Sequence, residues 1–413
     1  MTSAMMLKSF AAGLGRRASP PQAPVRHFNS RLSPEQLMIQ KTCRDFGQKE
    51  LQPVVAQLDR DAVYPEKQIK QLGALGLMGM CVSPSYSGLG LDTLTLSVAV
   101  EQLSSHCSST GVILSIHNCL YANLLDRRGT PRQKEEFLLP FTQGTVGSFA
   151  LSEPNAGSDV ANIQTTARKD GDFWVLNGTK SWVTSAREGK AIIVFARVDK
   201  TKNHRGITAF ILSLDTPGVS LGPKDDLMGI RALSSCNVIL EEVRVPQEQV
   251  LGAVGEGFKI AMEQLDRARI GISSQALGIS QAALDCATDY SLQRVAFGAP
   301  LAELSAVQNR LAEISIRLEG ARLLVRRAAW ECDAGAPFTR HSCTAKVAAS
   351  TCAALATHNC VQVLGAMGLV RGLPAERLYR DARVTQIYGG ATDIQMMVIG
   401  QALIKEYVHK DKC

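Results

Sequence analysis

The feature that most constrains this 413-residue chain is a change of local pattern that occurs twice along it. Residues 33–143 are mainly helical in pattern, residues 146–246 are rich in β-forming and turn residues, and helical patterning returns from Gly257 onward. A chain of this length can support two or three cores. The order helix, strand, helix therefore predicts an α+β multidomain protein whose strands are gathered in its middle.

The helical segments carry two specific signals. Ser33-Pro34-Glu35 is typical of a helix start. Between residues 307 and 328 the apolar residues recur at alternating steps of four and three, which predicts a helix packed in a bundle. These apolar residues are Val307, Leu311, Ile314, Leu318, Ala321, Val325 and Ala328.

The middle segment contains several strand-sized runs. Residues 174–176 and 181–184 flank Asn177-Gly178, a dipeptide that predicts a β-hairpin turn between them. The apolar runs 191–196 and 207–214 are also short enough to be strands. We therefore expect a β-domain of about a hundred residues.

The N-terminal segment differs from the rest of the chain in charge. Residues 1–28 contain Lys8, Arg16, Arg17 and Arg26 but no acidic residue, and without them the net charge of +7 would fall to about +3. This pattern predicts a mitochondrial transit peptide, with a basic tail as the alternative. The remaining charge gives no reason to infer nucleic-acid binding.

The composition argues against several other classes of protein. No apolar run reaches the roughly 18 residues of a membrane span. The eleven cysteines are scattered, without a CxxC pair or metal-ligand spacing, which fits buried thiols in a reducing compartment. We therefore expect no disulfide framework, no metal site and no membrane span.

Two short segments are candidates for contact with a flat, polar ligand. FALSEPNAGSD, residues 149–159, offers small and hydroxyl residues whose backbone N–H groups can approach a ligand. In KSWVTSA, residues 180–186, Trp182 and Thr184 alternate along a strand and so face one side. A turn without a ligand, and a Trp182 buried in the core, are the simpler interpretations.

Three further motifs lie in helical segments. Asp266 and Arg269 are three residues apart and share a helix face, where a surface ion pair is the simpler alternative to ligand binding. Arg294, near a helix end, offers a guanidinium fork for phosphate. Gly365 and Gly368 permit close backbone approach to another chain or ligand.

Taken together, these segments resemble the acyl-CoA dehydrogenase family, and its short-chain (butyryl-CoA) branch most closely. The resemblance runs from about Gln40 to Tyr407 and includes FALSEPNAGSD, WVLNGTKSWVT, QALGISQAALDCA, RVAFGAPL and RDARVTQIY. It implies an N-terminal all-α domain, a middle β-barrel or sandwich domain and a C-terminal four-helix bundle. The expected boundaries are 1–28 for the transit peptide, then 29–145, 146–250 and 251–413 for the domains.

The resemblance also implies FAD, an acyl-CoA substrate, electron-transfer flavoprotein as the electron acceptor, a homotetramer and a place in the mitochondrial matrix. It places FAD against Phe149, Ala150, Leu151, Ser152, Ser158, Trp182, Val183 and Thr184, and it also counts Ser305, Ala391 and Asp393 among the FAD contacts. Other FAD contacts are expected to come from a neighbouring subunit: Arg294, Gln362, Gly365 and Ala366. The acyl-CoA site is expected to contain Ser158, Asp266, Arg269 and Gly390.

One position departs from the family pattern in a way that bears on catalysis. Most of the family has a glutamate after the tyrosine of this signature, and this glutamate removes the α-proton of the acyl-CoA; here the residue is Gly389. The alternative base position used by a minority of the family is Ala268, which has no carboxylate either. Asp393 would have to reach back a full helical turn. We also expect Gly389-Gly390 to loosen the local backbone and leave a water-sized gap.

Three further departures concern FAD contacts. Ser305 stands where a glutamine is usual, Ala366 replaces a glycine and Ala391 replaces a threonine. Three functions therefore remain open. The protein is a weak or altered FAD-dependent short-chain acyl-CoA dehydrogenase, an inactive paralogue that binds FAD and acyl-CoA, or a flavoenzyme of the same fold with base-independent chemistry. The third would include β-elimination from a substituted acyl-CoA.

Overall fold

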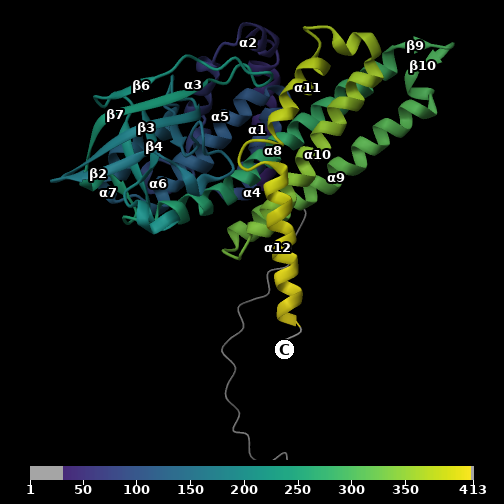
Figure 1. Cartoon of the computed structure of the whole chain (residues 1–413). Coiled ribbons are helices and arrows are strands. Elements are labelled where there is room, and N and C mark those ends of the chain that lie inside the picture. The colour runs from purple at the N-terminus through teal and green to yellow at the C-terminus, as the bar shows by residue number, and fades with distance from the viewer. Residues whose placement is uncertain (1–30, 411–413) are drawn as a thin grey trace, which may run out of the picture.

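The computed structural model describes residues 31–410, and these form a helical, a sheet and a second helical part in chain order (Figure 1). The predicted transit peptide, residues 1–28, lies outside the described residues. The predicted α–β–α order along the chain is confirmed.

Seven α-helices build the first part of the described chain, residues 31–143. The first begins as expected, because the Ser33 side chain accepts from the backbone N–H of Gln36 and the Gln36 side chain accepts in return from Ser33. The helices are α1 (Pro34–Phe46), α2 (Val55–Asp61), α3 (Glu66–Ala74), α4 (Thr93–His106), α5 (Ser108–Ile116), α6 (Asn123–Arg128) and α7 (Pro131–Phe137).

The middle part is an eight-stranded mixed sheet in the order β6-β7-β3-β2-β4-β5-β8, with β1 paired parallel to β4. Its strands are β1 (Gly147–Ala150), β2 (Thr166–Asp170), β3 (Phe173–Thr184), β4 (Ala191–Arg197), β5 (Ile207–Ser213), β6 (Val219–Leu221), β7 (Ser235–Pro246) and β8 (Val250–Leu251).

Both faces of the central strands are buried, which explains why β4 and β5 read as continuous apolar runs. Ile192 and Val194 join a core that β3 and β7 also line, and Trp174 meets Phe210 across it at 5.8 Å between ring centroids. Phe195, on the opposite face, packs in a cluster shared with α6, α7 and the first turns of α8. One face of the central strands therefore packs against helices, and the other face packs against further strands of the same sheet.

The hairpin predicted at Asn177-Gly178 is wrong, because β3 runs through these residues without a turn. The pairing of β3 with β7 shifts register between Leu176 and Gly178, as in a β-bulge. Gly178 has φ +149°, and a Cβ there would lie 2.5 Å from the Thr165 hydroxyl. Gly178 thus allows the segment at Thr165 to approach β3 closely. The turn between β2 and β3 lies instead at Gly171, with φ +60°.

The second helical part is a bundle around a 37-residue helix, α8. The apolar stripe predicted between residues 307 and 328 is confirmed, since Ile314, Leu318 and Val325 of α9 are buried. The elements are α8 (Gly257–Gln293), β9 (Val295–Ala296), β10 (Ala299–Pro300), α9 (Ser305–Asp333), α10 (Thr339–Leu364), α11 (Pro374–Val384) and α12 (Thr392–Lys410).

Among the described residues, one helical segment is long and apolar enough to cross a membrane by length and composition, Thr339–Leu369. It consists of α10 and a short 3-10 turn, and half of its most apolar window is buried inside the structure. Its buried residues, including Ala349 and Ala353, pack in the core of the bundle with residues of α8 and α9. Packing within the bundle accounts for its apolar composition.

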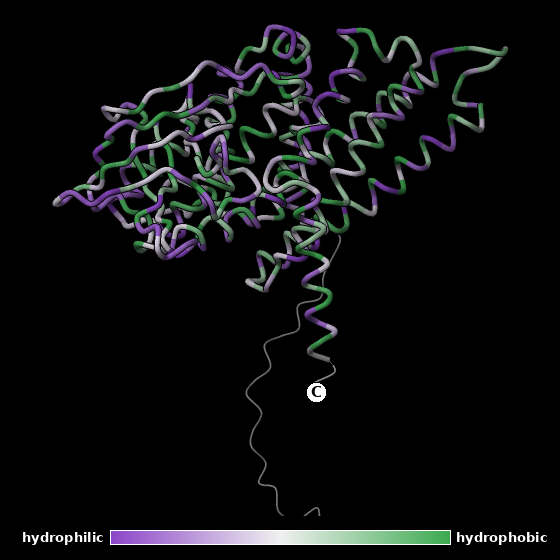
Figure 2. Tube along the Cα trace, in the orientation of Figure 1, coloured by the Kyte–Doolittle hydropathy of each residue, from purple (hydrophilic) through white to green (hydrophobic). Residues whose placement is uncertain are grey.

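Two regions of the bundle extend away from the body of the molecule: the β9–β10 ribbon and α12 (Figure 1). Phe297, at the tip of the ribbon, is 94% exposed. Several apolar residues of α12 are also exposed, and green segments mark them in Figure 2. They are Met396, Met397, Leu403, Ile404, Tyr407 and Val408.

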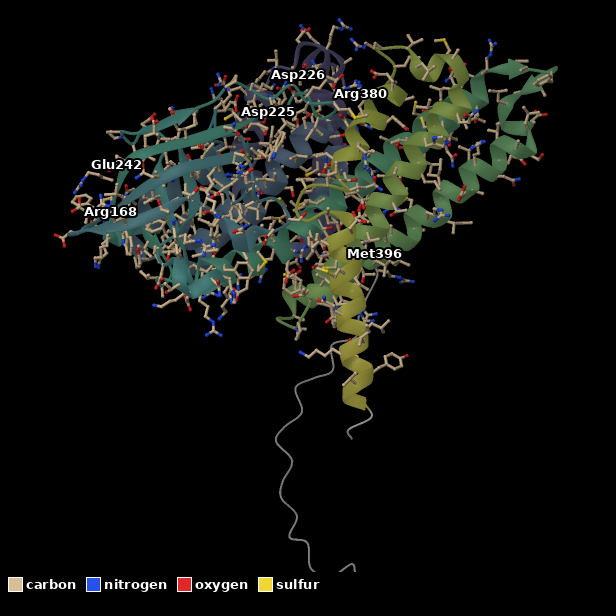
Figure 3. All side chains as sticks on the ribbon, viewed as in Figure 1. Arg168, Asp225, Asp226, Glu242, Arg380 and Met396 are labelled. Atoms are coloured by element: carbon tan, nitrogen blue, oxygen red, sulfur yellow. The ribbon has the colours of Figure 1, made fainter. Side chains whose placement is uncertain are left out.

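A cluster of charges joins the three parts at one side of the molecule. Arg380 of α11 pairs with Asp59 of α2 at 2.6 Å and with Glu376 at 2.7 Å, and it also donates to the carbonyl of Met228 at 3.1 Å. Figure 3 shows Arg380 at this junction, with Asp226 nearby. The contacts connect the first helices, the segment before β7 and the bundle, and so fix α11 in place.

Candidate functional site

The two segments expected to meet a flavin lie side by side. The backbone N–H of Ser181, in β3, donates to the carbonyl of Ser152, after β1, at 2.9 Å. The hydroxyl of Ser148 donates to the carbonyl of Thr184, also at 2.9 Å. The structure thus brings residues 149–158 and 182–184 together although they are separated by about thirty positions in the sequence.

A buried ion pair lies directly under this junction. The Lys180 ammonium is fully buried, pairs with Glu153 at 2.7 Å and donates to the carbonyl of Leu151 at 3.1 Å. Burial lowers the pKa of Lys180 to about 8 even though Glu153 opposes this shift. The pair fixes the loop after β1 to β3, and sequence analysis missed it although both residues lie within the quoted motifs.

Trp182 is a surface residue, so the simpler interpretation of a core tryptophan is wrong. It is 65% exposed and has φ +60°, and the pairing of β3 with β7 shifts register between Lys180 and Val183. Val183 is buried, whereas Thr184 is half-buried. The irregularity therefore presents an indole ring and a hydroxyl outward from a rigid strand.

The other predicted residues of this region divide by burial. Ala150 and Leu151 are buried, as is Val183, so their side chains belong to the core and only their backbone can face a ligand. Phe149 and Ser152 are half-buried, and Ser158 is exposed in the loop.

Gly389 and Gly390 form the turn between α11 and α12. Both lie in the left-handed region, with φ +65° and +99°, a conformation that glycine adopts without strain. The carbonyl of Gly390 accepts from Lys346 of α10 at 2.7 Å and from Gln395 of α12 at 3.3 Å. Arg269 of α8 donates to the carbonyl of Gly389 at 3.4 Å.

This turn is held firmly, so the expectation of a loosened backbone with a water-sized gap is wrong. Side chains from three helices hydrogen-bond its two carbonyls, and the preceding Tyr388 donates from its hydroxyl to Gln275 of α8. A Cβ added at Gly389 would lie 2.2 Å from the Cδ1 of Ile272. The terminal methyl of Ile272 therefore fills the space that a side chain at this position would enter.

Asp266 and Arg269 do form an ion pair, but it is buried rather than on the surface. Their side chains are 13% and 8% exposed, and Asp266 also accepts from the Thr339 hydroxyl. Burial raises the pKa of Asp266, with the Arg269 charge acting in the opposite direction. The carboxylate is thus engaged on both oxygens, and its role here is to orient Arg269 toward the Gly389 carbonyl.

Lys346 is the second buried lysine of the site, and sequence analysis did not identify it. It is 1% exposed, and none of the ion pairs found within residues 31–410 involves it. Burial and the neighbouring Arg269 charge lower its pKa to about 8. Its Cε lies 4.0 Å from the position of a Cβ at residue 389. The sequence did contain a signal for Lys346, because it is the single charged residue within the mostly apolar residues 344–356.

The remaining predicted contacts fall into two groups. Ala391 immediately precedes α12 and Asp393 lies in its first turn, and Asp393 is exposed. Arg294, Ser305, Gln362, Gly365 and Ala366 are all exposed at the end of the bundle that carries β9 and β10. Arg310 of α9 donates to Asn359 of α10 at 2.8 Å, which places the start of α9 beside the end of α10. In Figure 1 this end lies far from β3.

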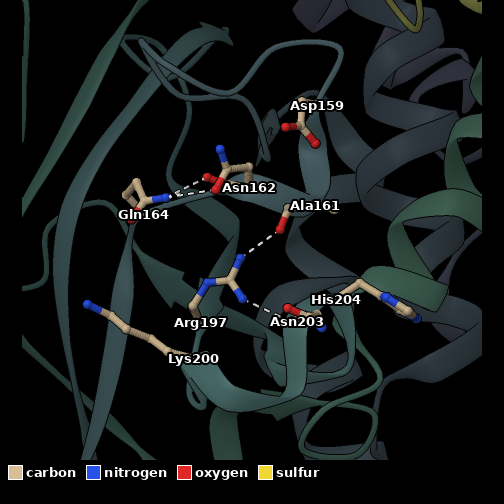
Figure 4. A pocket seen from close by; sticks show the side chains of 8 residues that line it. All are labelled: Asp159, Ala161, Asn162, Gln164, Arg197, Lys200, Asn203 and His204. Carbon is tan, nitrogen blue, oxygen red and sulfur yellow. Dashed lines mark hydrogen bonds between the residues drawn. The ribbon is translucent and has the colours of Figure 1, made fainter.

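A polar cavity of about 460 Å³ opens beside the loop that contains Ser158. Figure 4 shows the guanidinium of Arg197 at its centre, donating to the carbonyls of Ala161 and Asn203. The cavity is lined by Asp159, Ala161, Asn162, Gln164, Arg197, Lys200, Asn203 and His204. Within the described part of the chain, no group of three or more His, Cys, Asp or Glu residues is arranged to hold a metal ion.

Three sequence models of one family match successive parts of this fold. They describe the N-terminal, middle and C-terminal domains of acyl-CoA dehydrogenases and match residues 33–145, 148–243 and 255–404. The chain belongs to the acyl-CoA dehydrogenase family. It is therefore an FAD-dependent oxidoreductase.

Individual relatives sharpen this assignment. The chain is 51% identical over 371 residues to the mitochondrial short-chain specific acyl-CoA dehydrogenase of Mus musculus, and the match covers 90% of each protein. It resembles the structure of butyryl-CoA dehydrogenase from Megasphaera elsdenii with a TM-score of 0.89 and 41% identity, over 92% of this chain and 100% of that one. A chain in the structure of the electron transferring flavoprotein of Acidaminococcus fermentans matches with a TM-score of 0.90 and 39% identity, over 91% and 99% of the two chains.

The residues around Trp182 suit the flavin that this family binds. An indole ring that is 65% exposed on a rigid strand offers a flat stacking surface. The adjoining loop, residues 152–158, offers the hydroxyl groups of Ser152 and Ser158 and a glycine that lets the backbone approach polar edges. Thr184, two residues after Trp182 on β3, is half-buried and so partly accessible.

Proposed function

We propose that this protein oxidises short-chain acyl-CoA to trans-2-enoyl-CoA in the mitochondrial matrix, at a rate reduced by the absence of a carboxylate at position 389. The similarity to the short-chain enzyme of Mus musculus and to butyryl-CoA dehydrogenase supports the substrate class. The glycine at the turn between α11 and α12 supports the reduced rate. FAD, when bound, accepts the β-hydrogen as a hydride, while a base on the protein takes the α-proton.

The expected loss of rate follows from the usual contribution of general bases, which is about 10²–10⁴-fold. The other carboxylates of the region do not replace the missing one. Asp266 is engaged by Arg269 and Thr339, and Asp393 is exposed on α12. Ala268, the alternative base position, is buried and apolar. Binding is expected to suffer less than catalysis, because most of the proposed contacts lie elsewhere.

In this proposal the acyl-CoA lies between Ser158, the Asp266–Arg269 pair and Gly390. The cavity beside the Ser158 loop would then receive the polar end of coenzyme A. Its lining includes the basic residues Lys200 and His204, which suit phosphate groups. The Arg197 guanidinium is already bonded to backbone carbonyls and holds the wall of the cavity.

The proposed assembly is a homotetramer in which one subunit completes the flavin site of another. The residues expected to reach FAD from a neighbour, including Arg294 and Gln362, are exposed at the end of the bundle away from Trp182. Phe297 beside them is 94% exposed, and α12 carries further exposed apolar residues. Exposed apolar surface of this extent is typical of an interaction site.

Two further parts of the proposal come from relatives. The mitochondrial enzyme of Mus musculus supports a mitochondrial location, and residues 1–28 would be the transit peptide. The likeness to a chain in the electron transferring flavoprotein structure supports an electron-transfer flavoprotein as acceptor.

The decisive experiment restores a carboxylate and follows the flavin. The purified yellow protein is mixed anaerobically with butyryl-CoA, and bleaching of the flavin absorbance is timed. Gly389→Glu alone should give little gain, because its Cβ meets Ile272 and φ is +65°. Gly389→Glu combined with Ile272→Ala removes the contact with Ile272, leaves only the backbone strain at φ +65°, and should accelerate bleaching by about 10²–10⁴-fold.

The matched control is Gly389→Gln with Ile272→Ala, which has the same shape without the carboxylate and should remain slow. Equal rates for the Glu and Gln variants would show that the carboxylate is not the missing element. A protein that purifies without flavin, or that shows no spectral change with any short acyl-CoA, would overturn the proposed function itself.

A further inference from the structure

Lys346 lies where a group that accepts a proton would be needed, if the function proposed above holds. Its Cε is 4.0 Å from the position of a Cβ at residue 389. Its Nζ donates to the carbonyl of the next residue, Gly390, at 2.7 Å. A side chain at residue 389 would therefore begin beside the end of the Lys346 side chain. Of the described residues, Lys346 is thus the one that brings a titratable nitrogen to the turn.

The lysine is held in a setting that favours its neutral form. Its side chain is 1% exposed. The titratable groups that face it are Arg269 of α8, whose charge repels an ammonium, and the Cys343 thiol of its own helix, whose pKa is raised by burial. The nearby Asp266 is paired with Arg269. Burial and the Arg269 charge lower the pKa of Lys346 to about 8. A desolvated lysine of this kind can act as a general base near neutral pH.

The turn does not depend on Lys346 alone. The Gly390 carbonyl also accepts from Gln395 at 3.3 Å, and Arg269 donates to the Gly389 carbonyl. Tyr388 is fixed separately by Gln275. The turn therefore keeps other hydrogen bonds when Lys346 gives up its own. Lys346 is thus available for proton transfer and is not required as the anchor of the turn.

We propose that the neutral amine of Lys346 accepts the α-proton of the acyl-CoA in place of the missing carboxylate. The lone pair of Nζ forms a new N–H bond as the α-carbon–hydrogen bond breaks, and its electron pair stays on the substrate. In the full reaction this pair forms the double bond while the β-hydrogen leaves as a hydride to FAD, the established oxidant. Lys346 ends as an ammonium ion and returns its proton to solvent. Lys346 is thus a catalytic residue of the proposed reaction.

The proton transfer can be measured without oxidation. A 3-thia-acyl-CoA has sulfur at its β position and cannot lose hydride, but its α-hydrogens can exchange with deuterium from D₂O. The FAD-loaded protein is incubated with this ligand at several pH values, and α-exchange is followed by NMR. We expect exchange to increase with pH up to about 8 and then level off, following the neutral fraction of Lys346.

Two variants separate a base from a structural support. Lys346→Arg keeps a cation and a donor for the Gly390 carbonyl but cannot lose its proton, and Lys346→Met keeps similar bulk without charge. Both should lower exchange by about 10²–10⁴-fold while flavin content and the spectral shift on ligand binding persist. Lys259→Met, at an exposed lysine of α8, is the matched control and should exchange normally.

Adding Gly389→Glu and Ile272→Ala to Lys346→Met should restore exchange, because a carboxylate then stands at the same place. Undiminished exchange in Lys346→Arg would overturn the role of Lys346. If flavin and ligand bind but no exchange occurs at any pH, the role of Lys346 as a base would also be overturned. The proposed function would not be overturned by that result. A protein that binds neither FAD nor ligand would instead overturn the proposed function.

Discussion

Two buried lysines, one in the sheet and one in the bundle, have similar pKa values but opposite surroundings. Lys180 is paired with Glu153 at 2.7 Å and fixes the loop that follows β1. Lys346 instead donates to the backbone carbonyl of Gly390 at 2.7 Å and lies beside Gly389. Burial lowers the pKa of each to about 8. The comparison separates a lysine that stabilises the fold through a counter-ion from one without a counter-ion, which we propose accepts a proton.

The largest effect is expected from removing the counter-ion in the sheet. Glu153→Gln leaves the Lys180 ammonium buried without a compensating charge, and this should cost about 3–5 kcal/mol in the free energy of unfolding. Urea denaturation of the FAD-loaded protein measures it. Glu66→Gln, which breaks the exposed pair with Lys70, is the control and should cost less than about 1 kcal/mol. A similar small loss for both variants would remove the distinction between the two lysines.

The second prediction gives Lys346 the counter-ion that it lacks. In the double variant Gly389→Glu, Ile272→Ala, a carboxylate beside Lys346 should raise the pKa of this lysine by roughly 1–3 units. An NMR titration of isotope-labelled lysine Cε signals, with Lys346→Met to assign the peak, measures the shift. The pKa of Lys180 should stay unchanged in the same spectra, and an unshifted Lys346 would mean that the new carboxylate does not approach it.

The third prediction concerns the pH dependence of stability. Each lysine has a folded-state pKa near 8, below its ordinary value of 10.5. Between these values the unfolded chain binds more protons than the folded one, so the free energy of unfolding should rise with pH. Lys346→Met should reduce this rise when unfolding is measured by urea at pH 7.5 to 10.5 in steps of about half a unit. An identical slope in wild type and variant would contradict the lowered pKa.

The smallest effect is expected for the stability of Lys346→Met at pH 7. The variant loses one hydrogen bond to Gly390 but also removes a buried charge, so the free energy of unfolding should change by no more than about 1.5 kcal/mol. Lys180→Met should be clearly more destabilising, because it leaves Glu153 buried without its partner. Equal losses in the two variants would indicate that Lys346 is as structural as Lys180.

Much of the fold follows from local sequence patterns. The Ser33 helix start and the stripe along α9 were predictable because capping and apolar spacing act within a few residues. The α–β–α order was predictable for the same reason. The hairpin at Asn177-Gly178 was not, because Gly178 is required by Thr165, which approaches it from another segment.

The candidate site was predictable only in part. The motifs placed Trp182 and the Asp266–Arg269 pair, but the exposure of the first and the burial of the second depend on strand pairing and helix packing. Lys346 lies 43 residues before Gly389 in the sequence. Its position at the turn depends on how α10 packs against α8 and α12, which no local pattern specifies.

The length of α8 ties two distant positions together. Arg269 lies near its first third, whereas Arg294 follows its last residue, and at 1.5 Å per residue the two are roughly 40 Å apart. One unbroken helix therefore sets the distance between the proposed acyl-CoA site of a subunit and the tip proposed to contact its neighbour. Inserting a single residue between them would rotate one end by about 100° relative to the other. The residues of the two sites would then no longer face the directions that they face now.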